Sequence, residues 1–431
     1  MAVSRAVAAG AVLALTIGAP WSSAKAQKER PFDVVAAELK SPDPRTRLEA
    51  VRQLSVAGYL EAVMPLAGVL ADPDQRVARA AMYGELGLFL GARVDAEGRV
   101  AFIFERPRSN PAMQAFESSW GSLPVMPVPP EVIEGLTRGL AFEDVGERVE
   151  ALAALAVVAQ VDGAATPAHQ KAAEAVALRL GDPEPAVRAT AARAAGRLFR
   201  RCAAPCDGEG AVKLGDGLIR GLGDPEGPVL MAMIEGLGEM RYVRGVEALT
   251  RVHERFGKEP PGLAALDALG RIGSAASVPL FKAAVSRKEP AARRAAVEGL
   301  ARVGDRDGLA AAVSQIEAGP KNAEVALGAA FAQQRIGLGQ HLSPLFNAAG
   351  GKDTALQVQD YLIELGRPVA PQVAAALPAA TGEARARLIE VLGVVGGPDE
   401  ARAIEAARSN AGNRVEAAAQ RTLRRLAAFS R

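Results

Sequence analysis

The sequence contains few of the residues that carry out catalysis or hold metals. Its 431 residues include three histidines, two cysteines and two tryptophans, and only 4% are aromatic. It has no Gly-x-Ser-x-Gly, His-Glu-x-x-His or phosphate-loop pattern. Zinc would need two ligands besides the cysteines, and the Cys-x-x-Cys-His motif of haem attachment is missing. We therefore expect a non-enzymatic protein with no metal and no cofactor, whose His169, His253 and His341 are packed or solvated.

Long apolar runs are equally scarce. Arg5 precedes the apolar run 6–19, and Ala24-Lys25-Ala26 follows after Pro20. This order predicts a secretory signal peptide that is cleaved after Ala26; the alternative is an uncleaved N-terminal anchor. No later run approaches the roughly 20 residues of a membrane-spanning helix. We expect a soluble mature chain that is periplasmic or secreted.

An excess of basic charge is also missing. The chain has 51 basic and 49 acidic residues, and two of the basic ones, Arg5 and Lys25, belong to the predicted signal peptide. The mature chain is therefore close to neutral. Nucleic-acid binding needs a basic surface, so we expect no nucleic-acid partner.

The sequence does contain a recurring helix start. "LGDPEPAVRATAARAAGRLF" at 180–199 has counterparts at 222, 70 and 39. We expect Asp182 to cap a helix whose first residue is Pro183. Val187, Ala191 and Leu198 then share one helix face with Ala194 and Ala195.

Glycines mark the ends of these helices at a regular interval. Gly273, Gly304, Gly337, Gly366 and Gly396 follow one another at about 30 residues. A proline commonly opens a second apolar helix soon afterwards, as in "SVPLF" at 277–281. Two helices per period predict an all-α solenoid.

The chain resembles the HEAT-repeat family, in particular the short repeats of phycobilisome lyases. The resemblance is carried by Asp182, Pro183, Val187 and Arg188, by "LGRIG" at 269–273 and by "VPLF" at 278–281. It implies an α-solenoid of about ten HEAT-like helix pairs, shaped as an elongated curved rod. HEAT repeats serve scaffolds, adaptors and enzyme subunits alike, so the resemblance leaves the partner open.

The repeat signals predict where the first helix of each pair lies. We expect these helices near 43–57, 73–90, 146–160, 183–200, 225–240, 260–273, 289–303, 321–336, 353–365 and 381–394, with a closing helix near 412–428. The resulting division is a signal peptide (1–26), N-terminal HEAT-like repeats (27–90), an insertion within a repeat (91–130), further HEAT-like repeats (131–411) and a C-terminal capping helix (412–431).

The insertion 91–130 breaks the period. Its first part is compatible with a small β-hairpin, and prolines follow. It gathers four aromatic residues in an aromatic-poor chain, namely Phe102, Phe104, Phe116 and Trp120. They are candidate partner-binding residues; alternatively, they cover the side of the solenoid.

Two further features are a pair of cysteines and a group of arginines near the C-terminus. Cys202 and Cys206 are the only cysteines, and their spacing in an exported protein predicts a disulfide between them. Arg414, Arg421, Arg424 and Arg425 on the closing helix suit the solvated face of a terminal repeat. An anion-binding patch is the alternative for these arginines.

The preferred functional interpretation is an extracytoplasmic scaffold or adaptor that binds proteins. The alternatives are an accessory subunit of an exported enzyme or envelope complex, and a ligand-binding protein that uses the insertion 91–130. The sequence does not identify the partner.

Overall fold

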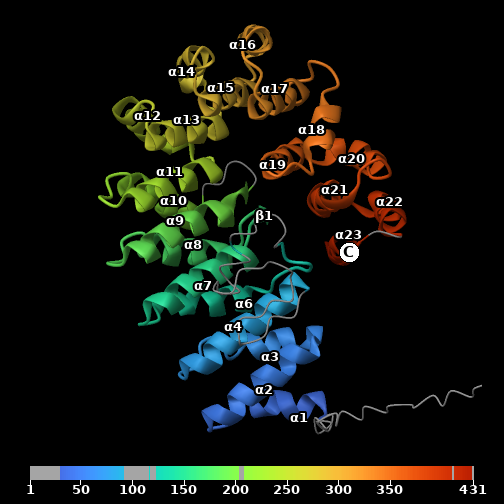
Figure 1. The fold of residues 1–431 in the computed structure, drawn as a ribbon. Helices are drawn as coiled ribbons and strands as arrows, with labels where there is room; N and C mark the ends of the chain where they lie inside the picture. Colours follow the sequence, from blue (N-terminus) through green and yellow to red (C-terminus); the bar gives the residue numbers. More distant parts are fainter. Residues whose placement is uncertain (1–29, 92–115, 117–122, 203–207, 410–411, 430–431) are drawn as a thin grey trace, which may run out of the picture.

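The computed structural model describes residues 30–91, 116, 123–202, 208–409 and 412–429. These residues form an α-solenoid of stacked helix pairs (Figure 1), which confirms the predicted fold class. No helix among them is long and apolar enough to cross a membrane. The predicted β-hairpin of the insertion lies outside the described residues.

The first helices of the pairs form one row. They are α2 (Pro44–Ala57), α4 (Gln75–Leu90), α7 (Val145–Val158), α9 (Pro185–Phe199), α11 (Gly227–Glu239), α13 (Pro260–Ile272), α15 (Pro290–Val303), α17 (Ala323–Arg335), α19 (Ala355–Leu365) and α21 (Gly382–Val395), followed by the closing helix α23 (Asn413–Phe429). Each of these helices begins within about two residues of its predicted start, because proline and acidic side chains mark helix starts reliably.

The remaining helices form a second row on the outside of the arc. They are α1 (Phe32–Glu38), α3 (Val63–Ala67), α6 (Pro130–Arg138), α8 (Pro167–Arg179), α10 (Glu209–Gly221), α12 (Val246–Phe256), α14 (Val278–Ala284), α16 (Arg306–Ala318), α18 (Leu342–Ala348), α20 (Ala370–Ala376) and α22 (Pro398–Arg408). Short 3₁₀ helices, η1 (Leu60–Ala62), η3 (Gly139–Ala141), η4 (Val243–Gly245), η5 (Ala275–Ser277) and η6 (Arg367–Val369), join several pairs.

Two short strands form a parallel pair that the sequence did not predict. They are β1 (Asp162–Gly163) and β2 (Arg201–Cys202), and Asp162 is opposite Arg201 in the register. Each strand follows an inner helix, α7 or α9, so the pair extends the stacking of these two helices toward the middle of the arc (Figure 1).

The helix starts differ from the prediction in one respect. Helix α9 begins at Pro185 with Glu184 at its N-cap, two residues later than expected. The predicted cap, Asp182, is buried and accepts hydrogen bonds from the Glu184 N–H at 3.1 Å and from Arg148 Nη2 at 3.2 Å. Its carboxylate is thus used in the turn before the helix and in a contact with the preceding repeat.

That contact recurs along the solenoid and explains the aspartate and arginine of the repeat motif. Arg47 Nη2 donates to Asp72 Oδ1 at 2.7 Å, and Arg188 Nε donates to Asp224 Oδ2 at 2.8 Å. The arginine of one repeat therefore pairs with the motif aspartate of the next. Arg188 Nη1 also donates to the carbonyl oxygens of Asp182 and Pro183, both at 2.9 Å, which closes its own turn.

The core consists of apolar faces packed between neighbouring helices. Leu198 is 1% exposed, which confirms its predicted place on the apolar stripe, and Leu269 of α13 is 0% exposed. Helices α13 and α15 end at Gly273 and Gly304, whose φ angles of 66° and 84° lie in the left-handed region that favours glycine. The helix ends thus follow the glycine signals of the sequence.

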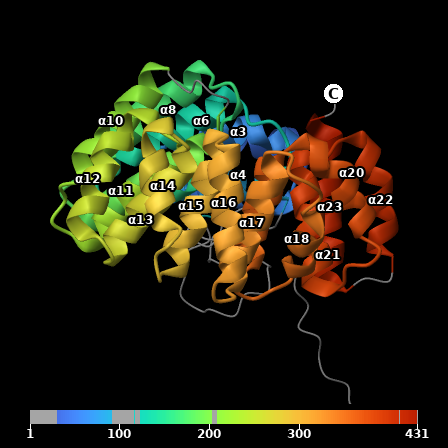
Figure 2. The ribbon, with the colours of Figure 1, turned by 90° about the horizontal axis from the view of Figure 1, so that it is seen from above.

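The solenoid bends much more tightly than the predicted elongated curved rod (Figures 1 and 2). Arg425 of α23 donates to the Pro124 carbonyl oxygen and lies 3.3 Å from Asp162 Oδ2. These partners are 301 and 263 residues away in the chain. The predicted curvature is present, but the elongated shape was the wrong expectation, since the last helix returns to the segment between α4 and α6.

The contacts of the closing helix also correct the prediction of a solvated face on it. Arg425 is buried, and Arg421 Nη2 lies 3.2 Å from Glu390 Oε1. Arg414 Nη2 lies 2.8 Å from the same oxygen, whereas Arg424 is exposed. Burial lowers the pKa of Arg425 to about 10. Three of the four arginines therefore bind groups of the protein itself.

Candidate functional site

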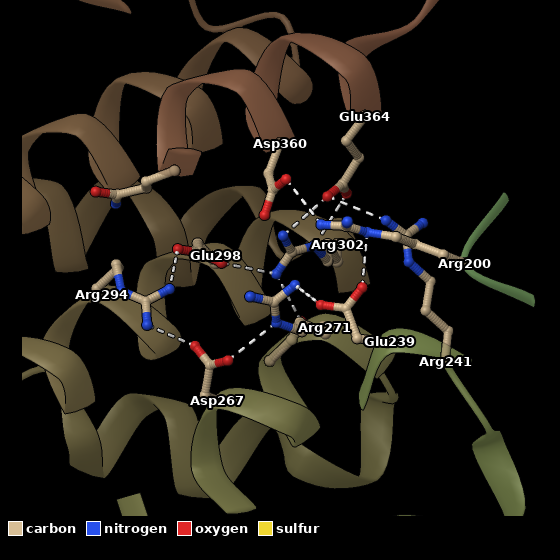
Figure 3. Close-up of polar contacts among 12 residues, drawn as sticks. Arg200, Glu239, Arg241, Asp267, Arg271, Arg294, Glu298, Arg302, Asp360 and Glu364 are labelled. Carbon is tan, nitrogen blue, oxygen red and sulfur yellow. Dashed lines mark hydrogen bonds and ion pairs between the residues drawn. The ribbon is translucent and has the colours of Figure 1, made fainter. Parts of the chain in front are cut away.

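A cavity of about 1070 Å³ lies on the inner side of the arc. Helices α13, α15, α17, α19 and α21 contribute to its wall, together with β1, β2 and the ends of α9 and α11. Arginines and acidic residues line it in equal numbers. Many of them pair with one another, so the cavity contains a polar network rather than an apolar surface (Figure 3).

The repeat places these charges. Arg271, Arg302, Arg335 and Glu364 each stand two residues before a helix-ending glycine, and so occupy the same position in four successive repeats. Equivalent positions on stacked helices lie next to one another, so their side chains meet on the inner surface. The glycine period and the helix starts did not predict that these charged side chains meet. The charged residue two positions before each glycine is visible in the sequence and could have indicated it.

Glu364 lies at the centre of one cluster. Arg302 forms a bidentate pair with it, with both N···O distances at 2.9 Å. Arg241 Nη2 and Arg335 Nη1 lie 3.1 and 3.2 Å from its two oxygens. These arginines hold the pKa of Glu364 at about 2, against the effect of burial, which would raise it. Glu364 is therefore a fixed negative charge that joins α15, α17 and the end of α11 to α19.

A second cluster connects α9, α11, α13 and α15. Glu239 accepts from Arg200 Nε at 2.7 Å and from Arg271 Nη1 at 2.6 Å. Asp267 accepts from Arg271 Nε at 2.9 Å and from Arg294 Nη2 at 2.6 Å. Burial would raise the pKa of Asp267, but the two arginines lower it well below its ordinary value. Figure 3 shows the two clusters side by side.

Arg241 has an unusual backbone. Its φ of 51° makes it the one residue other than glycine, among those described, in the left-handed region. Such a conformation costs on the order of 1–3 kcal/mol and persists where surrounding contacts impose it. Here the residue follows the end of α11, and its guanidinium pairs with Glu364 of α19. Burial lowers the pKa of Arg241, and Arg302 and Arg335 lower it further.

One large apolar side chain is exposed within this charged cavity. Leu356 on α19 is 53% exposed and lines the cavity. It also lines a smaller neighbouring cavity of about 450 Å³, whose wall includes Phe116 and Arg197. A half-exposed leucine among charged groups is a suitable contact for an apolar side chain of a partner.

The predicted aromatic residues of the insertion are only partly described. Phe116 is 7% exposed and belongs to the solenoid core. Arg197 donates to its carbonyl oxygen, and the Arg197 guanidinium lies 5.7 Å from its ring centre. For Phe116 itself, this placement favours the alternative in which the aromatic residues cover the side of the solenoid. Phe102, Phe104 and Trp120 lie outside the described residues, so their proposed role stays a prediction.

The cysteine prediction is also only partly accessible. Cys202 is the second residue of β2 and lines the cavity. Its predicted partner, Cys206, lies outside the described residues. The disulfide between them stays a prediction.

The histidines serve local structure. His169 Nδ1 accepts from the Thr166 N–H at 3.1 Å in a capping box at the start of α8, and burial lowers the pKa of His169. His253 Nδ1 lies 2.6 Å from the Gly262 carbonyl oxygen, and His341 Nε2 lies 3.1 Å from that of Leu338. Within the described part of the chain, no three His, Cys, Asp or Glu side chains gather as a metal site would require.

Comparison with known proteins gives similarity only among solved structures. No known family profile and no curated protein matches the chain. An importin beta structure covers 92% of this chain and 58% of its own, with 14% identity and a TM-score of 0.40. A designed armadillo repeat protein in complex with the peptide (KR)4 covers 63% of this chain and 99% of its own, with 15% identity and a TM-score of 0.34.

The complex of CpcE and CpcF of phycocyanin lyase from Nostoc sp. PCC7120 is a further match. It covers 68% of this chain and 97% of its own, with 17% identity and a TM-score of 0.30. These likenesses concern the helical-repeat architecture already described, and the function is argued below from the cavity itself.

Proposed function

We propose that this protein is a non-enzymatic scaffold, outside the cytoplasm, that binds a segment of a partner protein in its inner cavity. The observation that carries this proposal is Leu356, an apolar side chain left half exposed within a cavity of paired charges. Protein interfaces commonly combine an apolar anchor with a polar rim. Equal numbers of acidic and basic groups favour a polypeptide over a nucleic acid, whose phosphates require a basic surface.

The charge network supports a binding role rather than an acid–base role. A catalytic acid or base needs a pKa near the working pH. The pKa values of Glu239, Asp267 and Glu364 are all shifted down, away from neutral pH, because arginines lower the pKa of each carboxyl group. These groups are permanently charged at neutral pH and suit the alignment of a partner chain.

The proposed location rests on the sequence. The apolar run 6–19 and the Ala24-Lys25-Ala26 site precede the first described residue, Arg30. They support export of the chain to the periplasm or the medium.

Two leucines provide a matched test of the binding site. Leu356 lines the inner cavity, whereas Leu178 on the outer helix α8 is 70% exposed. The native host would express tagged wild type, Leu356→Asp and Leu178→Asp, and the proteins purified with each would be compared by quantitative mass spectrometry. Both substitutions place a charge on an exposed apolar position, so their effects on solubility should be similar.

The expected result is a partner that co-purifies with wild type and Leu178→Asp and is lost from Leu356→Asp. Loss from Leu178→Asp alone would place the interaction on the outer row and overturn the proposed site. Equal recovery with all three proteins would exclude Leu356 as an anchor.

A further inference from the structure

The apolar core of the solenoid is divided in two. One cluster of buried apolar residues extends from Val35 to Ala332, and a second extends from Leu327 to Leu426. Helix α17 contributes one face to each cluster. Contacts between the backbones of α17 and α19 are much sparser than those between the other neighbouring inner helices from α7 to α17. The regular stacking is therefore interrupted after α17.

The connection between α17 and α18 has the properties of a hinge. Residues 337–340 are exposed, and Gly337 and Gly339 have φ angles of 71° and 119°. Glycine tolerates large changes of backbone angle at such positions, and hinges are short segments that absorb such changes. The break in the core lies along α17, directly before this segment in the chain, and Leu327, Ala330 and Phe331 of α17 belong to the second cluster.

Polar contacts bridge the break. Helix α19 supplies Glu364, which pairs with Arg241 and Arg302 of the preceding body (Figure 3). Glu364 also pairs with Arg335 of that body. Tyr361 of α19 donates to Glu298 of α15, and its ring stacks on Phe331 of α17 at 4.3 Å between ring centres. The angle between the two bodies is thus held by directional polar contacts together with the apolar face of α17 that packs in the second cluster.

A second set of contacts holds the far end of the C-terminal body. Arg425 of α23 donates to the Pro124 carbonyl oxygen and pairs with Asp162 of β1. Between the two ends, Arg200 Nη2 donates to Asp360 Oδ1 at 2.8 Å. The C-terminal body therefore contacts the N-terminal one at its beginning, along α19 and at its last helix.

The inner cavity lies between the two bodies. Arg200, Glu239 and Arg302 line it from one side, and Leu356, Tyr361 and Arg367 from the other. We propose that residues 342–409 and 412–429 form a lid that rotates about residues 337–341 and is held over the cavity by the contacts of Glu364 and Arg425. This device goes beyond the proposed function, because it concerns access to the cavity whatever enters it.

Distance measurement between spin labels tests the lid directly. Labels would be placed at Leu178→Cys on α8 and Ala406→Cys on α22, both exposed and on different bodies, in a Cys202→Ser/Cys206→Ser background. The test variant is Glu364→Gln/Arg425→Gln, which removes the carboxylate charge at the centre of the Glu364 contacts and the guanidinium charge of Arg425. The control is Asp224→Asn, which weakens a repeat-to-repeat ion pair within the N-terminal body.

We expect the test variant to shift the label-to-label distance distribution to longer and broader values than in the labelled parent, whereas the control leaves it unchanged. Far-UV circular dichroism identifies any variant that does not fold. Arg241→Gln removes one partner of Glu364 at a half-exposed site and provides a milder variant with a smaller shift in the same direction. If the test variant folds and its distance distribution matches that of the parent, the lid proposal is overturned. If the test variant does not fold, a parent-like distribution in Arg241→Gln overturns it.

Discussion

Replacing Glu85 by glutamine should stabilise the protein, and increasingly so as the pH rises. Glu85 lies on α4, is 0% exposed, and neither of its carboxyl oxygens has a hydrogen-bond partner in the described part of the chain. Its neighbours along the helix, Ala81, Met82 and Phe89, are buried apolar residues. Burial without a counter-charge raises the pKa of Glu85 to about 9.

The raised pKa fixes the sign and size of the effect. The folded protein holds this proton up to about pH 9, whereas the unfolded chain releases it near pH 4.5, so stability falls as the pH rises between these values. Each pH unit costs about 1.4 kcal/mol, which gives a loss of about 3 kcal/mol at neutral pH and about 6 at pH 9 and above. Glutamine has the shape of the protonated acid and does not ionise.

Urea denaturation followed by circular dichroism would measure this. The unfolding midpoint of Glu85→Gln should approach that of wild type near pH 5 and exceed it progressively toward pH 8.5, within the window set by the shift. Glu61→Gln changes an exposed glutamate and serves as the control. The reasoning is refuted by a midpoint difference that does not grow with pH, or by a Glu85→Gln protein less stable than wild type throughout.

The remaining predictions concern packing and processing. Leu198→Ala and Leu269→Ala should each lower the unfolding free energy by roughly 2–5 kcal/mol in chemical denaturation, because both side chains are fully buried; a loss below about 0.5 kcal/mol would contradict this. N-terminal sequencing of the exported protein should begin after Ala26, and an intact Met1 in a cytoplasmic fraction would contradict export. Mass spectrometry of unreduced protein should show a peptide linking Cys202 and Cys206, whereas two alkylatable thiols would exclude the disulfide.

The sequence predicted local features of the fold well. Helix bounds followed from Pro, Asp and Gly at fixed places in each repeat, because these residues act within one turn of the chain. The role of Asp182 was missed, since its partner Arg148 belongs to the preceding repeat. The buried Glu85 was also missed, although its place among apolar residues of the helix was a visible signal.

The candidate site depends on the superhelical bend, which no local pattern encodes. Arg302 and Glu364 are 62 residues apart, and Arg200 and Asp360 are 160 apart. Small rotations between successive helix pairs add up until these side chains meet. The sequence shows the charged residues that precede the helix-ending glycines. It does not show that α19 would turn back onto α9 and α15.

Site-specific photocrosslinking in the native host tests the central claim most directly. A photoreactive amino acid at position 356 should yield a covalent adduct with a partner protein, and the same residue at position 178 should not, because only the former lies in the inner cavity. An adduct at 178 without one at 356 would contradict the account, as would a protein that carries out its cellular role with no adduct at 356.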